Sequence, residues 1–530
     1  MRAWRDGLTY SGADGRLGDA LWAAKAGWRR AREVELAAAA APAQSASSQQ
    51  SAGAGTSWRP CKRIRRATCI GDADRILMAK WCARLSAILE KGDTPSWRQA
   101  RNAADPASAI AGFVGKARPT TVKKRVRDWE VMTRWLQWFR GRQWPACSTD
   151  LVDYLAARVA QGCPPSFPES LRSAVLWVEA RTGHKIENTF GREEFFKKNV
   201  DRAAVVAMTE AEAVKKAPCI PLIVIAALEC RVMNMEAAMG MRVMAWSRLL
   251  KVFGVMRWDD LQRLRPRDAS LRASGLVGLL TQTKTSGAGK KVRDLPLFIP
   301  GDAYVLCAEW LRTGHGLWSQ LGSKGRDYFL PRFTEDLENC FNVPASSGDL
   351  AILGRKVLEE TKVPVWGSDG SDTWSEGPMP LVPGPLLNGW SGHSERCTLP
   401  SLFAAMGIAK QDRDPLGRWS PSGSDDYVRT YRALVQSLAK RLRTMLGEGN
   451  VFKDADEEEA IEDVKVYAAR SCGEEPEVLQ EAADHLIATA KLFYGLLSMS
   501  PGDVQSGVPR VPVVVDAVVE DVLVGPRRPT

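Results

Sequence analysis

Apolar residues recur three or four positions apart in one segment of the chain after another, which is the spacing of amphipathic helices. Residues 71–91 are a clear case, with Trp81, Leu85 and Leu89 on one face. The same spacing predicts further helices at residues 120–139, 148–161, 169–181, 222–253, 303–311, 431–446 and 475–497. Residues 276–283 and 292–299 instead have the composition of two paired strands around a turn at 286–289. We therefore expect a mainly helical fold with one β-hairpin.

The length of 530 residues predicts two or three domains. Residues 1–70 are expected to be a disordered tail, because an Ala, Ser, Gln and Gly tract at 37–57 lacks the large apolar side chains of a core. The remaining boundaries are a short helical lead-in at 71–115, a helical domain at 116–205, a larger domain at 215–446, and an acidic, helical, partly disordered extension at 447–530. The Gly-, Ser- and Pro-rich run at 366–390 is predicted to be a long surface loop.

The formal net charge of +11 favours a polyanionic partner. Eleven cysteines are dispersed without a Cys-x-x-Cys pair and only four histidines are present, so we expect no metal site. Dispersed cysteines fit a reducing compartment. We expect no membrane span and no signal peptide, and hence an intracellular protein, nuclear if eukaryotic. The basic run at 62–66 fits either a nuclear import patch or a solvated surface.

A basic amphipathic helix is expected within residues 116–143, which hold nine Lys and Arg against two acids. Its apolar face includes Val126, Trp129 and Met132. The cations lie largely elsewhere, and composition fits a DNA-phosphate surface and an ordinary solvated face equally well. The candidate DNA-binding residues are Lys123, Lys124, Arg125, Arg127 and Arg134.

Four separated patches of the larger domain hold residue types that could act together on one phosphate. Two arginines can grip the non-bridging oxygens of a phosphate, and a tyrosine hydroxyl can attack a phosphorus held in that way. A lysine on a hairpin can protonate the departing 5′ oxygen, and an indole N–H can donate to the phosphate. Such a reaction requires neither a metal nor a small-molecule cofactor. In chain order the candidates are Arg257, Lys284, His393, Arg396, Trp419 and Tyr427.

This order resembles that of the tyrosine recombinases, or phage-type integrases, over residues 118–445. The stretch VFGVMRWDDL at 252–261 is similar to the family's first arginine box, and Thr-Lys-Thr at 283–285 to its hairpin lysine. The stretch HSER at 393–396 resembles the second box. Gly-Arg-Trp at 417–419 resembles a Gly-His step with Trp in the second His place, and Tyr-Val-Arg at 427–429 the nucleophile segment.

The resemblance implies a two-domain clamp around double-stranded DNA. One domain would be a helical, SAM-like core-binding domain, and the other a mostly helical catalytic domain with a small antiparallel sheet. It further implies a site-specific recombinase of mobile-element origin, or a domesticated copy, acting as a homo-tetramer on DNA. Tyr427 would form a 3′-phosphotyrosyl link, Arg257 and Arg396 would hold the phosphate, and Lys284 would be the general acid. His393 would assist proton movement, and Trp419 would take the second His position.

Several alternatives remain open. Trp419 and Tyr427 are eight positions apart, one fewer than usual in the family, which leaves Tyr431 as a rival nucleophile. Lys290 and Lys291 are rivals to Lys284. Arg257 and His393 are 136 positions apart, which is a long interval for the family. A DNA-binding protein of the same fold that has lost cleavage is the main alternative function, and a helical scaffold that does neither is a more distant one.

Overall fold

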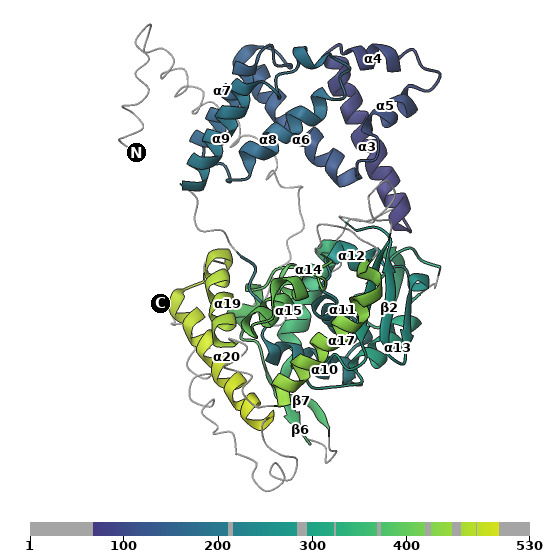
Figure 1. Cartoon of the computed structure of the whole chain (residues 1–530), viewed down its shortest axis with the longest axis vertical. Helices are drawn as coiled ribbons and strands as arrows, with labels where there is room; N and C mark the ends of the chain where they lie inside the picture. The colour runs from purple at the N-terminus through teal and green to yellow at the C-terminus, as the bar shows by residue number, and fades with distance from the viewer. Residues whose placement is uncertain are drawn as a thin grey trace, which may run out of the picture. The chain divides into compact units, whose positions relative to one another are not determined.

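A computed structural model describes residues 67–209, 216–283, 294–322, 325–367, 373–418, 426–447, 457–472 and 474–497. These residues are mainly helical with small antiparallel sheets, which confirms the fold class expected from the spacing of apolar residues (Figure 1). Their buried apolar side chains form two separate clusters, one within residues 81–203 and one within residues 220–494.

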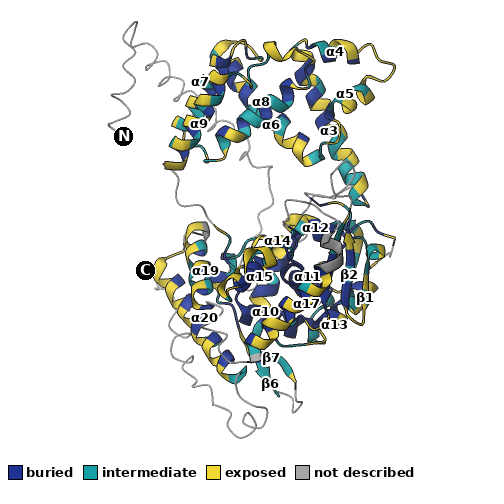
Figure 2. Cartoon of the chain, in the orientation of Figure 1, coloured by how far each residue is buried: buried dark blue, intermediate teal, exposed yellow. Residues whose placement is uncertain are grey.

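The first cluster is built entirely by helices. In chain order these are α3 (Ile70–Lys91), α4 (Pro95–Ala100), α5 (Pro106–Val114), α6 (Pro119–Arg140), α7 (Ser148–Ala160), α8 (Phe167–Glu179), the short 3-10 helix η1 (Ile186–Asn188) and α9 (Glu194–Thr209). Trp129 on α6 is 1% exposed and belongs to this core. The outer sides of the helices are exposed (Figure 2). Local signals set the helix ends: the Thr94 hydroxyl and the Asp105 carboxylate cap α4 and α5, and Gly141 ends α6 in a left-handed conformation.

The segment expected to be a lead-in shares this core. Trp81, Leu85 and Leu89 of α3 are buried in the same cluster as Val126 and Trp129 of α6. Residues 70–209 therefore form one helical body in which α3 packs on α6.

The second cluster centres on two consecutive helices, α10 (Leu222–Met233) and α11 (Met239–Phe253), whose residues are almost all buried. They are followed by α12 (Trp258–Gln262), η2 (Pro266–Asp268), α13 (Trp310–Gln320), α14 (Ser347–Glu360), η3 (Gly384–Asn388), α15 (Ser394–Ala405), α16 (Lys410–Arg413) and α17 (Asp426–Gly447). The last two helices, α19 (Glu457–Cys472) and α20 (Pro476–Leu497), pack on each other and on η3. Their buried residues join the same cluster, so the C-terminal helices are part of this body.

Three small antiparallel sheets accompany these helices. β1 (Ala269–Arg272), β2 (Gly275–Leu280) and β3 (Leu295–Pro300) form a sheet in that order, and Leu280 pairs with Leu295 at the end of the expected hairpin. The other two pairs are β4 (Pro331–Phe333) with β5 (Cys340–Pro344) and β6 (Lys362–Trp366) with β7 (Trp374–Pro380). Among the described residues, no helix is long and apolar enough to cross a membrane.

Two expectations for this body were wrong. The helix expected at 303–311 begins only at Trp310, because the buried carboxylate of Glu229 accepts hydrogen bonds from the backbone N–H groups of residues 305, 306 and 307. Those donors are then no longer available to a helix. The run at 366–390 contains β7 and η3 where a surface loop was expected, because backbone pairing with β6 orders a segment whose composition favours turns.

Candidate phosphate-binding site

The first candidate arginine follows a strained turn at the end of α11. Val255 adopts a left-handed conformation with φ of 47°, which a β-branched residue rarely does. Two residues later, Arg257 precedes α12, and its backbone N–H donates to Asp260 Oδ2 at 3.3 Å. Asp260 is buried, whereas the Arg257 side chain is 36% exposed. The turn thus presents one accessible guanidinium beside a buried carboxylate.

The second box, HSER at 393–396, comes from a distant part of the chain. His393 immediately precedes α15, and Arg396 lies in its first turn. Because α15 packs on α11, Arg396 reaches the same carboxylate: its Nη1 lies 3.6 Å from Asp260 Oδ2, and Nη1 of Arg257 lies 3.9 Å from the same oxygen. Asp260 therefore joins the two arginines, which are 139 positions apart in the sequence.

A third arginine completes this cluster, and it was not among the residues singled out from the sequence. Arg418 is 9% exposed, and its Nη2 donates to the backbone carbonyls of Gly254 and Val255 at 2.9 and 3.1 Å. Its Nη1 lies 3.5 Å from the Tyr431 hydroxyl. Arg418 thereby ties the strained turn before Arg257 to α17. Arg418 is a buried arginine in a turn, and its backbone has a φ of 56°. In the sequence, the Gly-Arg-Trp step was the only indication of its role.

The three guanidiniums concentrate positive charge in a small volume. Burial, together with the charges of Arg257 and Arg418, lowers the pKa of Arg396 to about 10, while Asp260 opposes this shift. Partial burial also lowers the pKa of His393 below 6.5, together with the cations Arg396, Arg257 and Lys251. His393 is therefore a neutral imidazole at pH 7, able to accept or donate a proton. Such a cluster favours an anion, since an anion relieves the repulsion among the cations.

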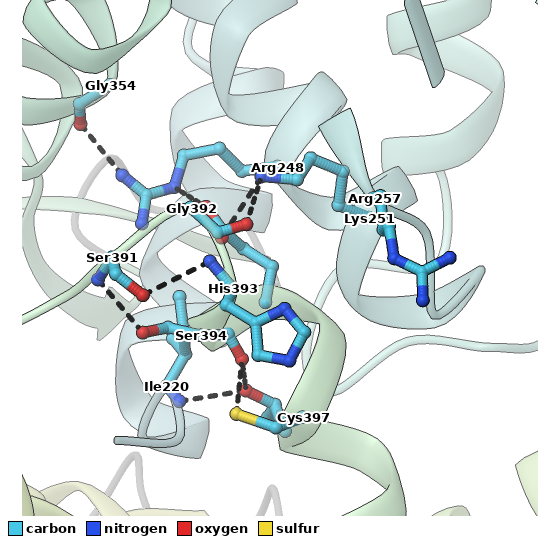
Figure 3. A network of polar contacts seen from close by, with 12 residues as sticks. Ile220, Arg248, Lys251, Arg257, Gly354, Ser391, Gly392, His393, Ser394 and Cys397 are labelled. Carbon is cyan, nitrogen blue, oxygen red and sulfur yellow. Dashed lines mark hydrogen bonds and ion pairs between the residues drawn. The ribbon is translucent and has the colours of Figure 1, made fainter. Parts of the chain in front are cut away.

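A buried ion network holds the helix of the second box in place. Glu395, which is 4% exposed, accepts from Lys251 Nζ at 3.1 Å and pairs with Arg248 Nε at 3.2 Å. Figure 3 shows Arg248 and Lys251 projecting from α11 towards the start of α15. Burial alone would raise the pKa of Glu395, but the two cations outweigh it, and the pKa lies below its ordinary value. Two cations three positions apart in an apolar helix were the available sequence signal.

The structure describes only some of the remaining site candidates. Lys284, its rivals Lys290 and Lys291, and Trp419 lie outside the described residues. Tyr427 falls in the first turn of α17, one turn before Tyr431. The Tyr431 ring is 3% exposed and belongs to the apolar core.

The candidate DNA-binding residues all lie on α6. Lys123, Lys124, Arg127 and Arg134 are exposed. Arg125 is half-buried, and its Nη1 donates to the Ser170 carbonyl at 3.2 Å. Positions 123, 127 and 134 share one face of the helix because they are separated by four and seven residues.

No family model matches this chain, and no match to it was found among curated proteins. Within the described residues, no group of three or more His, Cys, Asp and Glu side chains could hold a metal ion.

Proposed function

We propose that the protein is a site-specific DNA recombinase of the tyrosine recombinase type, which cuts and rejoins strands through a 3′-phosphotyrosyl intermediate. Residues 215–446 would be the catalytic domain and residues 116–205 the SAM-like core-binding domain. The observation that carries the proposal is the shared contact of Arg257 and Arg396 with Asp260, with His393 at the start of the same helix as Arg396. Two separated sequence patches thereby converge on one cationic cluster.

The proposed reaction needs this cluster to hold one phosphate of the DNA backbone. Arg257 and Arg396 would stabilise the charge that develops on the non-bridging oxygens. The Tyr427 hydroxyl would attack phosphorus, and a phosphotyrosyl bond would form as the bond to the 5′ oxygen breaks. Lys284 would protonate that oxygen, while His393 assists proton movement and the Trp419 indole donates to the phosphate. Because the energy of the phosphodiester is kept in the covalent link, rejoining needs no nucleotide cofactor.

Tyr427 is the better candidate nucleophile. The Tyr431 ring is packed in the core with its hydroxyl beside Arg418, so an attack from Tyr431 would require the ring to leave that core. Tyr427 lies one turn earlier, at the very start of α17. A nucleophile at a helix start can approach a phosphate without disturbing the buried part of the helix.

The proposed partner is double-stranded DNA inside the cell. A homo-tetramer would bind this DNA, and α6 would provide contacts to it. A trapping experiment tests the reaction. After attack on a nicked duplex with randomised arms, the short fragment that bears the released 5′ hydroxyl diffuses away, so a covalent protein–DNA adduct accumulates and is recovered under denaturing conditions. We expect an adduct with the wild type and with Tyr431→Phe, and none with Tyr427→Phe. A wild type that binds the same duplexes but forms no adduct would instead indicate a recombinase fold that has lost cleavage.

A further inference from the structure

Two cysteines meet directly behind the second arginine. Cys219 lies just before α10, and Cys397 follows Arg396 in the first turn of α15. Their sulfur atoms are 4.0 Å apart. A disulfide bond is about 2.0 Å long. The two sulfurs must therefore move about 2 Å closer together to bond, and the first turn of α15, which carries Cys397, must accommodate that movement.

The backbones on both sides of this pair are held together independently of the thiols. The Ile220 N–H donates to Thr398 Oγ1 at 2.8 Å, and the Trp390 indole N–H donates to the Cys219 carbonyl at 3.1 Å. Figure 3 shows the Ile220 contact beside Cys397, whose sulfur also lies 3.2 Å from the Ser394 carbonyl. The two thiols therefore meet in a fixed arrangement.

The two sulfurs differ in acidity. The contact with the Cys397 sulfur, assisted by Ser401, lowers the pKa of Cys219. The same contact raises the pKa of Cys397, as does burial. Cys219 is thus the better thiolate, and thiolates are the form that reacts with oxidants.

A cavity gives small molecules access to Cys219. It has a volume of about 280 Å³, and its lining includes Cys219, Thr398, Ser401 and Leu402 together with Glu457 and Asp463 of α19. A second thiol pair, Cys230 with Cys307, is closer at 3.7 Å, but Cys230 is 1% exposed and neither residue lines this cavity. Proximity and access therefore coincide at Cys219 and Cys397.

We propose that Cys219 and Cys397 are a redox-sensing dithiol that hydroperoxides oxidise to a disulfide, which small thiols reduce back to the two cysteines. The Cys219 thiolate attacks the hydroperoxide, the O–O bond breaks, and Cys219 becomes a sulfenic acid while the other oxygen leaves as an alcohol or water. The Cys397 sulfur then attacks Cys219, the S–S bond forms, and the sulfenic oxygen leaves as water with the thiol proton. The two sulfurs supply the two electrons that reduce the peroxide.

The disulfide would act on the arginine cluster because Cys397 is covalently adjacent to Arg396. Drawing Cys397 towards Cys219 shifts the first turn of α15, which carries both His393 and Arg396. This effect on catalysis rests on the proposed function, whereas formation of the disulfide does not. Displacing a catalytic group by about 1 Å can slow a reaction roughly a hundredfold, so we expect oxidation to slow adduct formation by about that factor.

The test uses the full chain treated with hydrogen peroxide, followed by alkylation of remaining thiols and peptide mass mapping. We expect a peptide pair linking Cys219 to Cys397 that disappears with dithiothreitol and in Cys219→Ser and Cys397→Ser, but persists when the exposed Cys147 is replaced by Ser. Wild-type protein in which Cys219 remains reduced, or links to another cysteine, overturns the proposal. A disulfide in a protein that forms no adduct even when reduced would count against the recombinase function alone. A disulfide that leaves the adduct rate unchanged overturns the regulatory part.

Discussion

The carboxylate of Asp260 lies 3.6 Å from the guanidinium of Arg396, and both side chains are almost fully buried. The same oxygen accepts the backbone N–H of Arg257, at the turn that leads into α12. One carboxylate therefore sets both the position of the first arginine's backbone and the charge environment of the second. This relationship makes Asp260 a positioning residue for the proposed phosphate site.

Replacing Asp260 with Asn should slow adduct formation while DNA binding persists. The amide can still accept the Arg257 N–H, but the charge that separates Arg257 from Arg396 is lost. Removing one partner of a buried ion pair typically costs about 3–5 kcal/mol, so the free energy of unfolding should fall measurably in a denaturant titration. The neighbouring Asp259 is exposed and provides the control: Asp259→Asn should change neither quantity. An Asp260→Asn protein with a wild-type adduct rate would show that this carboxylate does not orient the arginines.

Replacing Arg418 with Ala should disrupt the site and not merely destabilise the fold. Two buried carbonyls of the turn before Arg257 would lose their donor, at a cost of roughly 1–3 kcal/mol for each unsatisfied group. Arg418→Lys should restore little, because an ammonium lacks the planar arrangement of donors that a guanidinium has.

Arg413 supplies a matched comparison for Arg418. It also donates to two backbone carbonyls, those of Ile408 and Pro400 at 2.8 and 2.9 Å. Arg413→Ala should lower the melting temperature yet leave the adduct rate per folded molecule near the wild-type value. Equal effects of the two substitutions on that rate would contradict a specific role for Arg418.

The stability contributed by Glu395 should depend on pH in a defined direction. Its folded-state pKa lies below the ordinary value of 4.5, so its contribution is fully present above pH 4.5 and is lost as the pH falls through the folded-state pKa. Glu395→Gln should therefore unfold more readily than the wild type at pH 7, and this difference should shrink below pH 4.5. Chemical denaturation at several pH values measures it. Glu458 pairs with Lys491 on the surface, and Glu458→Gln should show no comparable difference at any pH.

The exposed cations of α6 should determine how strongly DNA binding depends on salt. Each phosphate contact contributes a slope of about −0.9 to the plot of log affinity against log salt concentration. Combined Ala substitutions at Lys123, Arg127 and Arg134 should flatten that plot by about 0.9 for every contact removed. Arg140 is on the same helix but paired with Asp153, and Arg140→Ala should change the slope less. An unchanged slope in the combined variant would indicate that this face of α6 is only solvated.

Sequence periodicity predicted the long helices well, since α3 and α20 begin and end within one residue of the predicted ranges. It failed where a side chain far away in the sequence accepted hydrogen bonds from backbone N–H groups, as Glu229 does at residues 305–307. It also failed at β7, whose Pro and Gly residues are typical of loops. In both places tertiary contacts override local preference.

The candidate site was predictable only in part, for a similar physical reason. The order of Arg257, His393 and Arg396 along the chain pointed to a common site, and the structure brings them together. The supporting carboxylate was not predictable. Glu395 looks like an ordinary surface residue until α15 packs on α11 and buries its charge against Lys251.

The most direct test of the central claim is to identify the atom through which protein and DNA become linked. Wild-type protein trapped on a nicked duplex is digested with protease and nuclease, and the nucleotide-bearing peptide is sequenced by mass spectrometry. The account predicts a 3′ phosphate attached to Tyr427. A 5′ linkage, a linkage to a residue other than tyrosine, or no linkage from protein that binds the duplex would contradict it.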